Sequence, residues 1–123
     1  MNQIVNPPDL PEPTGFSHVV ASGRTVYLAG QIAAGDTLVE QFDGAARGLV
    51  TALAGAGADP EDLVWLQVFV TDVAEYRDSR AVLGRVWRKH FGRHYPAIGM
   101  FGVTELFDPE AKVELMGIAV KQA

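Results

Sequence analysis

Apolar residues recur along this chain with two different periods, which separates expected strands from expected helices. Residues 16–21 and 25–31 are short runs rich in β-branched and aromatic side chains, and the Ser-Gly-Arg between them is typical of a hairpin turn. From 38 to 56, apolar residues recur at spacings of three and four, which predicts an amphipathic helix. The almost unbroken apolar run at 63–70 predicts a central strand buried on both faces.

The second half of the chain repeats this order of helix and strand. Apolar spacing predicts another amphipathic helix over 73–91, and Gly92 is well placed to close it. Two further strands are expected at 97–106 and 112–120, with an Asp-Pro-Glu turn between them. The order of elements therefore alternates strands with two helices of similar length.

The N-terminal segment is expected to run extended, because prolines between residues 6 and 13 fix the backbone there. Only a short edge strand is expected before them, at 3–5. These elements predict a single α/β domain of the α+β type over residues 1–123, with a mixed six-stranded sheet and both helices on one face. The other face of that sheet carries apolar positions, which predicts oligomerisation.

The composition excludes several classes of protein. With 48% hydrophobic and 20% charged residues, the chain has the composition of a globular domain. Its net charge of -5 argues against nucleic acid or an anionic membrane surface as a partner. Cysteine is absent, so disulfides, thiolate nucleophiles and thiolate metal sites are excluded. No run is long and apolar enough for a membrane span, and no signal peptide opens the sequence, so we expect a cytoplasmic protein.

A metal or phosphate site is not expected from the sequence. His90 and His94 are four residues apart, but a proline ends the helix there and no third ligand lies nearby. The basic residues between 85 and 94 are interpreted as a solvated helix face rather than a binding patch. The glycines form no loop of the phosphate-binding kind, because no Lys-Ser/Thr pattern follows them.

Residues 95–103 place a proline directly before a short apolar strand. Pro96 fixes φ and offers no donor to the sheet, so the strand is expected to begin just after it. Ile98 then occupies a prominent strand position, where it can neither donate a hydrogen bond nor hold a charge.

Five motifs stand in the order and spacing of a known family. Residues 14–20 (Thr-Gly-Phe-Ser-His-Val-Val) are similar to its Gly-Pro-Tyr-Ser-Gln-Ala-Val, and residues 26–32 (Val-Tyr-Leu-Ala-Gly-Gln-Ile) to its Val-Tyr-Leu-Ser-Gly-Gln-Ile. Residues 68–72 (Val-Phe-Val-Thr-Asp) resemble its central strand, and residues 95–98 (Tyr-Pro-Ala-Ile) stand where it reads Pro-Ala-Arg. Residues 106–116 match its terminal Leu-x-Asp-Pro-x-Ala-x-Val-Glu-Ile-Glu. Over nearly its whole length, the chain resembles the RidA family of small enamine and imine deaminases, once described as translation-inhibiting endoribonucleases.

The resemblance implies a chorismate-mutase-like homotrimer, with the three sheets facing inward and small-molecule clefts between neighbouring subunits. In the family's deaminases, the Arg of Pro-Ala-Arg binds the substrate carboxylate. The first Glu of the last strand, which is Glu114 in this sequence, positions or activates the water that attacks the imine carbon. This chemistry is hydrolytic and needs no cofactor, so a small-molecule substrate is the expected partner.

The sequence departs from the family pattern at positions that matter for this site. Ile98 replaces the family Arg, Phe16 replaces a Tyr, and Met116 replaces the second Glu of the last strand. The first Glu of that strand is retained as Glu114. Arginine binds a carboxylate through a planar fork of donors and a fixed charge, neither of which isoleucine supplies. We therefore expect a substrate other than an α-imino acid.

Strand alternation predicts which of these side chains share a surface. Ile98 and Met100 lie on one face of their strand, and Glu114 and Met116 lie on one face of theirs, which predicts a mostly apolar cleft with one carboxylate. Desolvation in such a cleft raises the pKa of a carboxyl and suits it to acid–base catalysis near neutral pH. In the alternative interpretation, Glu114 is a solvated or ion-paired strand residue.

Two further candidates have structural alternatives. By strand alternation His18 shares a side with Phe16, and it is the best second titratable group for the site, but a lone histidine is also commonly structural or exposed. Arg80 stands roughly where the deaminases carry an Asn on the second helix. It would supply a relocated anchor for an anion, or simply be solvated.

Two functions from different classes remain open. In the first, the protein is a RidA-like hydrolase, deaminase or tautomerase for a small enamine or imine intermediate, with Glu114 and His18 catalytic. The substrate pocket would then be lined by Phe16, Ile98, Met100, Met116 and Arg80. In the second, it is a non-catalytic trimer that binds a metabolite or a partner protein. Ribonuclease activity finds little support, because the acidic chain lacks a basic aromatic groove.

Overall fold

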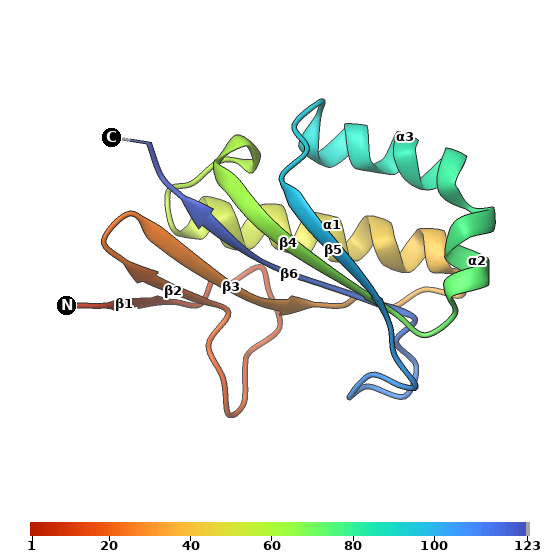
Figure 1. Cartoon of the computed structure of the whole chain (residues 1–123). Helices are drawn as coiled ribbons and strands as arrows, with labels where there is room; N and C mark the ends of the chain where they lie inside the picture. The colour runs from red at the N-terminus through yellow and green to blue at the C-terminus, as the bar shows by residue number, and fades with distance from the viewer. Residues whose placement is uncertain (123) are drawn as a thin grey trace.

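The computed structural model describes residues 1–122 as a curved sheet with its helices on one side (Figure 1). The strands are β1 (Gln3–Val5), β2 (Val19–Ser22), β3 (Thr25–Gln31), β4 (Leu63–Val70), β5 (Ala97–Gly102) and β6 (Val113–Val120). The helices are α1 (Leu38–Gly55), α2 (Val73–Asp78) and α3 (Arg80–Phe91), with a short 3-10 helix at Pro60–Asp62.

The strands form a six-stranded sheet in the order β1-β2-β3-β6-β4-β5. The β4–β5 pair is parallel, and the other neighbours are antiparallel. A parallel pair needs a crossover, which α2 and α3 provide between β4 and β5. The predicted two-layer α+β fold with a mixed six-stranded sheet is therefore confirmed.

One face of α1 forms the centre of the core. The residues at spacings of three and four along this helix are almost completely buried: Leu38, Phe42, Ala45, Ala46, Leu49, Ala52 and Leu53. α3 adds Leu83, Trp87 and Phe91 to the same core. Thr37 begins α1 by accepting a hydrogen bond from the backbone N–H of Glu40 at 3.1 Å. The helix pattern read from the sequence therefore matches the packed face.

β6 lies between β3 and β4 and alternates strictly between the two faces of the sheet. Val113 and Leu115 are buried against the helices, whereas Glu114 and Met116 point to the other side and are only half-buried. We call that other side the outer sheet face. Its apolar members are Tyr27, Trp65, Phe69, Phe101, Met116 and Ile118.

The prediction that the strand at 63–70 is buried on both faces is wrong for the single chain. Leu66 and Val68 are buried beneath the helices, but Trp65, Gln67 and Phe69 on the outer sheet face are half-exposed. Phe69 stacks on Phe101 of β5 with ring centres 5.5 Å apart. The outer sheet face is thus apolar without being covered by any element of residues 1–122.

The single helix predicted over 73–91 is in fact two helices. α2 ends at Asp78. Ser79 follows it with a φ of -99° and a ψ of 7°, which leave the helical range, and α3 begins directly after Ser79. The Ser79 N–H is shared between the carbonyls of Glu75 and Tyr76, which tightens the last turn. Gly92 closes α3 with a positive φ of 62°, as predicted.

Two strand boundaries also differ from the prediction. β2 begins at Val19 instead of residue 16, because Gly15 turns the chain with a φ of 82° and the N–H of His18 donates to the Asn6 side chain at 2.8 Å. β5 ends at Gly102 instead of near residue 106. The chain after Gly102 is therefore a loop, and this loop contributes to the site described below.

Asp43 on α1 ties this helix to α3. Its carboxylate accepts hydrogen bonds from His90 Nε2 at 2.7 Å, Lys89 Nζ at 3.0 Å and Arg47 at 3.1 Å. The bond from His90 is the main reason that the pKa of Asp43 falls to about 2, and Lys89 and Arg47 lower it further. Part of the basic cluster read as a solvated face therefore serves to hold the helix layer together.

None of the helices within residues 1–122 combines the length and apolar character needed to cross a membrane.

Candidate active site

The side chain of Glu114 occupies the space that Gly30 of the neighbouring strand leaves free, and we call this space the notch. Its side chain leaves β6 on the outer sheet face and lies over Gly30 of β3, so closely that a methyl group at Gly30 would overlap the carboxylate. The pairing of β3 with β6 shifts register between Leu28 and Gln31, which marks a bulge at Ala29 and Gly30. The bulge and the missing side chain together make room for the carboxylate.

A cavity of about 420 Å³ opens beside this carboxylate. We call it the Glu114 cavity, and it is lined by Phe16, Ala29, Gly30, Ile32, Leu106, Phe107, Asp108 and Glu114. Its walls come from the loop before β2, the end of β3, the loop after β5, and β6. The lining is therefore apolar apart from two carboxylates, and none of these residues is cationic.

The carboxyl of Glu114 is a weaker acid than an exposed glutamate. Burial raises its pKa above the ordinary value of 4.5, because desolvation disfavours the charged form. None of the ion pairs within residues 1–122 includes Glu114. The alternative interpretation was a solvated or ion-paired Glu114. No ion pair of Glu114 forms within residues 1–122, and its half-buried position favours the cleft interpretation over a solvated side chain.

His18 lies behind the cavity rather than on its surface. It is 4% exposed, with Nε2 2.7 Å from the carbonyl of Pro11 and Nδ1 3.1 Å from the side-chain amide of Gln31. A carbonyl can only accept, so the imidazole is assigned as the neutral form with its proton on Nε2, and Nδ1 accepts from Gln31. Both nitrogens of His18 are therefore engaged in the structure.

The contacts of His18 nevertheless reach two walls of the Glu114 cavity. Its ring meets Phe16 edge to face with ring centres 5.2 Å apart. The amide of Gln31 also donates to the carbonyl of Ala29 at 3.4 Å, and the N–H of Ala29 donates to the carbonyl of His18 at 2.9 Å. These bonds connect His18 to the bulge that carries Gly30, so the structure places His18 behind the cavity wall and not among the residues that line it.

Met100 and Arg80 meet in a second, smaller cavity of about 280 Å³ on the helix side of the sheet. We call it the Arg80 cavity, and it is lined by Val70, Val73, Tyr76, Arg77, Arg80, Met100, Phe101 and Gly102. Arg80 opens α3, and its Nε donates to the carbonyl of Arg77 at 3.0 Å. Two arginines thus line a hollow whose other lining residues are apolar or aromatic.

The remaining two candidates lie apart from both cavities. Ile98 pairs with Leu66 in the parallel β4–β5 ladder, so it faces the helix side of the sheet and is 41% exposed. Met116 faces the outer side, in a shallow hollow with Tyr27 and Trp65. The predicted cleft that unites Ile98 and Met100 with Glu114 does not form within one chain, because the two groups lie on opposite faces of the sheet.

The comparisons with known proteins agree with this geometry. The family model described as Endoribonuclease L-PSP matches residues 9–121. The chain belongs to the RidA family. A 2-iminobutanoate/2-iminopropanoate deaminase of the mite Dermatophagoides farinae is 28% identical, over 96% of this chain and 95% of its own length. These RidA-family matches support a RidA-like function in general terms.

Solved structures of RidA-family proteins share the fold over almost the whole chain. A member of the YjgF/YER057c/UK114 family from Mycobacterium tuberculosis is 31% identical, with a TM-score of 0.84 over 98% of this chain and all of its own. RidA from the Antarctic bacterium Psychrobacter sp. is 24% identical, with a TM-score of 0.85 over 97% of this chain and 99% of its own. At that lower identity the likeness shows the fold alone.

Several residues of this RidA-family site were missed by reasoning from the sequence. The loop residues Leu106, Phe107 and Asp108 line the Glu114 cavity, although the sequence predicted strand for the first of them and a plain turn for the last. Arg77 joins Arg80 in the second cavity, and their spacing of three on a predicted helix was a usable signal. Among residues 1–122, His, Asp and Glu side chains form no group of three that could hold a metal ion.

Proposed function

We propose that the protein is a cytoplasmic RidA-family homotrimer that hydrolyses small reactive imines, or enamines after tautomerisation, that lack an α-carboxylate. The observation that carries this proposal is the Glu114 carboxyl, which is lodged over Gly30 at the mouth of an apolar cavity and has a raised pKa. A carboxyl in such surroundings can accept a proton from water and return it at neutral pH.

The hydrolysis uses this carboxyl twice. Glu114 accepts a proton from water while the water oxygen bonds to the iminium carbon, and the electron pair of the C=N bond moves to nitrogen. Glu114 then gives the proton back to the nitrogen of the resulting carbinolamine, and the C–N bond breaks to release ammonia. As the C=O bond forms, the hydroxyl proton passes through solvent to that ammonia and makes it an ammonium ion. One iminium and one water thus give one carbonyl compound and one ammonium ion. An enamine enters this sequence once a proton moves to its β-carbon.

The arrangement of the two cavities supports a trimer. The Glu114 cavity opens on the outer side of the sheet and the Arg80 cavity on the helix side, so one chain supplies two half-sites that do not meet. The outer sheet face is apolar and uncovered within residues 1–122. A RidA-like trimer would cover this face and bring the Glu114 cavity of one subunit to the Arg80 cavity of the next, so that Met100 and Arg80 complete the cleft.

The charges of the Glu114 cavity support a substrate without an α-carboxylate. Asp108 and Glu114 line it and no cation does, so an anion would be repelled there. In the family's deaminases an arginine holds the substrate carboxylate, and this chain has Ile98 at that position, which cannot do so. Arg80 is the remaining candidate for an anionic anchor, and within residues 1–122 no carboxylate forms an ion pair with its guanidinium.

The test is to supply imines formed in place by oxidases and to follow carbonyl and ammonia release above the spontaneous rate. Imines from simple amines should be turned over faster than those from amino acids. Turnover of amino-acid imines at the rate of an arginine-containing relative would contradict the proposed substrate. In that event Arg80→Ala, compared with Arg85→Ala on the same helix, shows whether Arg80 replaces the missing arginine.

A non-catalytic trimer is the second candidate function, and Ile98 is the observation that favours it. β5 presents Ile98 and Met100, so the strand that anchors substrates in the family's deaminases carries no polar side chain between Ala97 and Gly102. Saturable binding of small amines or carbonyl compounds with no turnover of any imine would support this second function and reject the first.

A further inference from the structure

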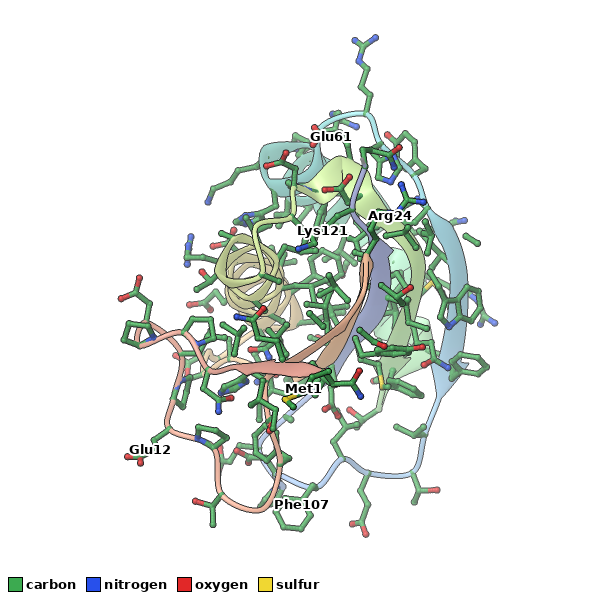
Figure 2. The ribbon with its side chains drawn as sticks, turned by 90° about the vertical axis from the view of Figure 1, so that its left-hand side faces the viewer. Met1, Glu12, Arg24, Glu61, Phe107 and Lys121 are labelled. Carbon is green, nitrogen blue, oxygen red and sulfur yellow. The ribbon has the colours of Figure 1, made fainter. Side chains whose placement is uncertain are left out.

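Three large apolar side chains stand exposed around the mouth of the Glu114 cavity. Phe16 is 53% exposed, Ile32 is 40% exposed, and Phe107 is fully exposed. Figure 2 shows Phe107 projecting from the end of the molecule into solvent. These residues come from three separate segments, namely the loop before β2, the end of β3 and the loop after β5. We call them the apolar rim.

Exposed apolar side chains that converge on one cavity are unusual on a small monomer. Of the other exposed hydrophobic residues, Val73, Met100 and Phe101 line the Arg80 cavity, whereas Ile4 and Tyr95 line neither the Glu114 cavity nor the Arg80 cavity. The apolar rim is also locally ordered, because Phe16 packs edge to face against the buried His18. A partner that covers the rim would gain the free energy of removing this apolar surface from water.

Two other lining residues of the same cavity have the opposite chemistry. Glu114 and Asp108 are carboxylates, and Oδ1 of Asp108 accepts the backbone N–H of Glu110 at 2.9 Å. Two carboxylates without a lining cation favour a positively charged group on the ligand. The complement of this half of the cleft is therefore the part of a molecule that carries a cationic head and an apolar substituent.

The size of the cavity favours a substituent larger than a methyl group. Its volume of about 420 Å³ falls in the range of roughly 300–1,000 Å³ that is common for small-molecule sites. A two-carbon imine would leave most of this space, and all of the apolar rim, in contact with water. A branched or aromatic substituent would fill it.

Building on the proposed function, we infer that the Glu114 cavity selects protonated imines that carry a branched aliphatic or aromatic substituent. The iminium faces Glu114 and Asp108, and the substituent packs against Phe16, Ile32 and Phe107. The apolar rim is thus a specificity element of this chain, separate from the carboxyl that performs the hydrolysis.

The test compares imines that a flavin amine oxidase forms from ethylamine, isobutylamine and 2-phenylethylamine. One methylene in a hydrophobic pocket changes kcat/KM by about 10–200-fold. The kcat/KM of the two larger imines should therefore be at least about tenfold higher than that of the imine from ethylamine. A preference for the ethylamine product would overturn the inference while leaving imine hydrolysis intact.

If no imine is turned over, the proposed hydrolase function is rejected, but the inferred selectivity of the cavity can still be tested by ligand binding. The ammonium forms of the three amines carry the same charge and substituents as the imines, and their dissociation constants can be measured by NMR titration. Tighter binding of isobutylamine and 2-phenylethylamine than of ethylamine, by about tenfold, would sustain the inference. Equal binding of all three, or none, would overturn it.

Phe107→Ala tests the apolar rim directly, because a fully exposed side chain can be truncated without loss of the core. The ratio of kcat/KM, or of affinity, between the isobutyl and ethyl compounds should fall by about fivefold or more. Ile4→Ala removes an exposed apolar side chain from β1 and should leave the ratio unchanged. An unchanged ratio in Phe107→Ala, or a change in its molecular mass by light scattering, would show that Phe107 contacts something other than the substrate.

Discussion

The carboxylates of this chain lie in very different surroundings. Glu105 is exposed on the loop after β5, whereas Glu114 is half-buried over Gly30 and has a raised pKa. Glu114→Gln keeps the size of the side chain but cannot accept a proton, so imine turnover should fall by at least about a hundredfold. Steady-state kinetics, with circular dichroism to verify the fold, measure this effect.

The control for this change is Glu105→Gln, which makes the same replacement on the exposed loop. It should keep the parent rate. Parental turnover by Glu114→Gln would remove Glu114 from the mechanism.

The pH dependence of turnover should report the same carboxyl. Glu114 must be ionised to accept a proton from water, so kcat/KM falls as the pH drops through its pKa. Burial raises that pKa, so the acid limb should lie above the ordinary glutamate value of 4.5. A pH–rate profile measures the limb, and full activity retained below pH 4.5 would contradict the assignment.

Gly30 should also be sensitive to substitution, because it makes room for the Glu114 carboxylate. A methyl group there overlaps the carboxylate, so Gly30→Ala should displace Glu114 and lower kcat by about tenfold or more. The matched control is Gly84→Ala on α3, where the added methyl meets nothing closer than 3.7 Å and should stabilise the helix slightly. Equal activity in the two variants would show that the carboxylate does not need the notch.

At the scale of secondary structure, most of the fold could be predicted from apolar periodicity. The second hairpin strand β3, helix α1 and the strands β4 and β6 were placed to within a residue or two, because each has a strongly apolar face. The break at Ser79 could not be read, since apolar spacing continues across it from Tyr76 to Leu83. Nor could the bulge at Gly30, which depends on pairing with a strand more than eighty residues later.

The link between α1 and α3 makes a prediction about stability. The pKa of Asp43 is lowered from 3.8 to about 2, so its stabilising contribution is present above pH 3.8 and is lost as the pH falls towards 2. Asp43→Asn should therefore reduce the free energy of unfolding at pH 7 by about 1–2 kcal/mol. Urea denaturation at pH 7 and at pH 2.5 measures the difference, which should shrink at the lower pH.

Asp78→Asn on α2 is the control for the Asp43 link, because this carboxylate is exposed. It should change stability by less than about 0.5 kcal/mol. A destabilisation by Asp43→Asn that is the same at both pH values would indicate lost packing rather than a lost ionic link.

At the scale of the whole molecule, the candidate site could be predicted only in part. The sequence identified Glu114, Phe16, Met100 and Arg80, each of which lines a cavity. It could not show that these residues divide between the two faces of the sheet, because alternation within each strand does not fix the register between strands. The loop that carries Phe107 was missed because its contacts depend on tertiary structure.

The proposed trimer rests on the outer sheet face and can be tested there. Phe69→Glu would place a charge beside Phe101 in the middle of that face, and burying it between subunits would be unfavourable. The variant should elute as a monomer, with imine turnover reduced by at least about tenfold. Light scattering after gel filtration measures the mass.

Ala54→Glu, on the exposed side of α1, is the control for the trimer test and should remain trimeric and active. A Phe69→Glu protein with an unchanged mass would exclude the outer sheet face as the interface. A monomeric parent protein would exclude the trimer itself.

The notch at Gly30 also provides a way to sort relatives from their sequences alone. Any side chain at position 30 competes with a glutamate at position 114 for the same space, so the two positions constrain each other regardless of what occupies position 98. A glycine and a glutamate at this pair would indicate a retained water-activating carboxyl even where the arginine is gone. A larger residue at position 30 would indicate that a carboxyl no longer occupies this space. Relatives with such a residue are the first candidates for binding proteins without catalysis.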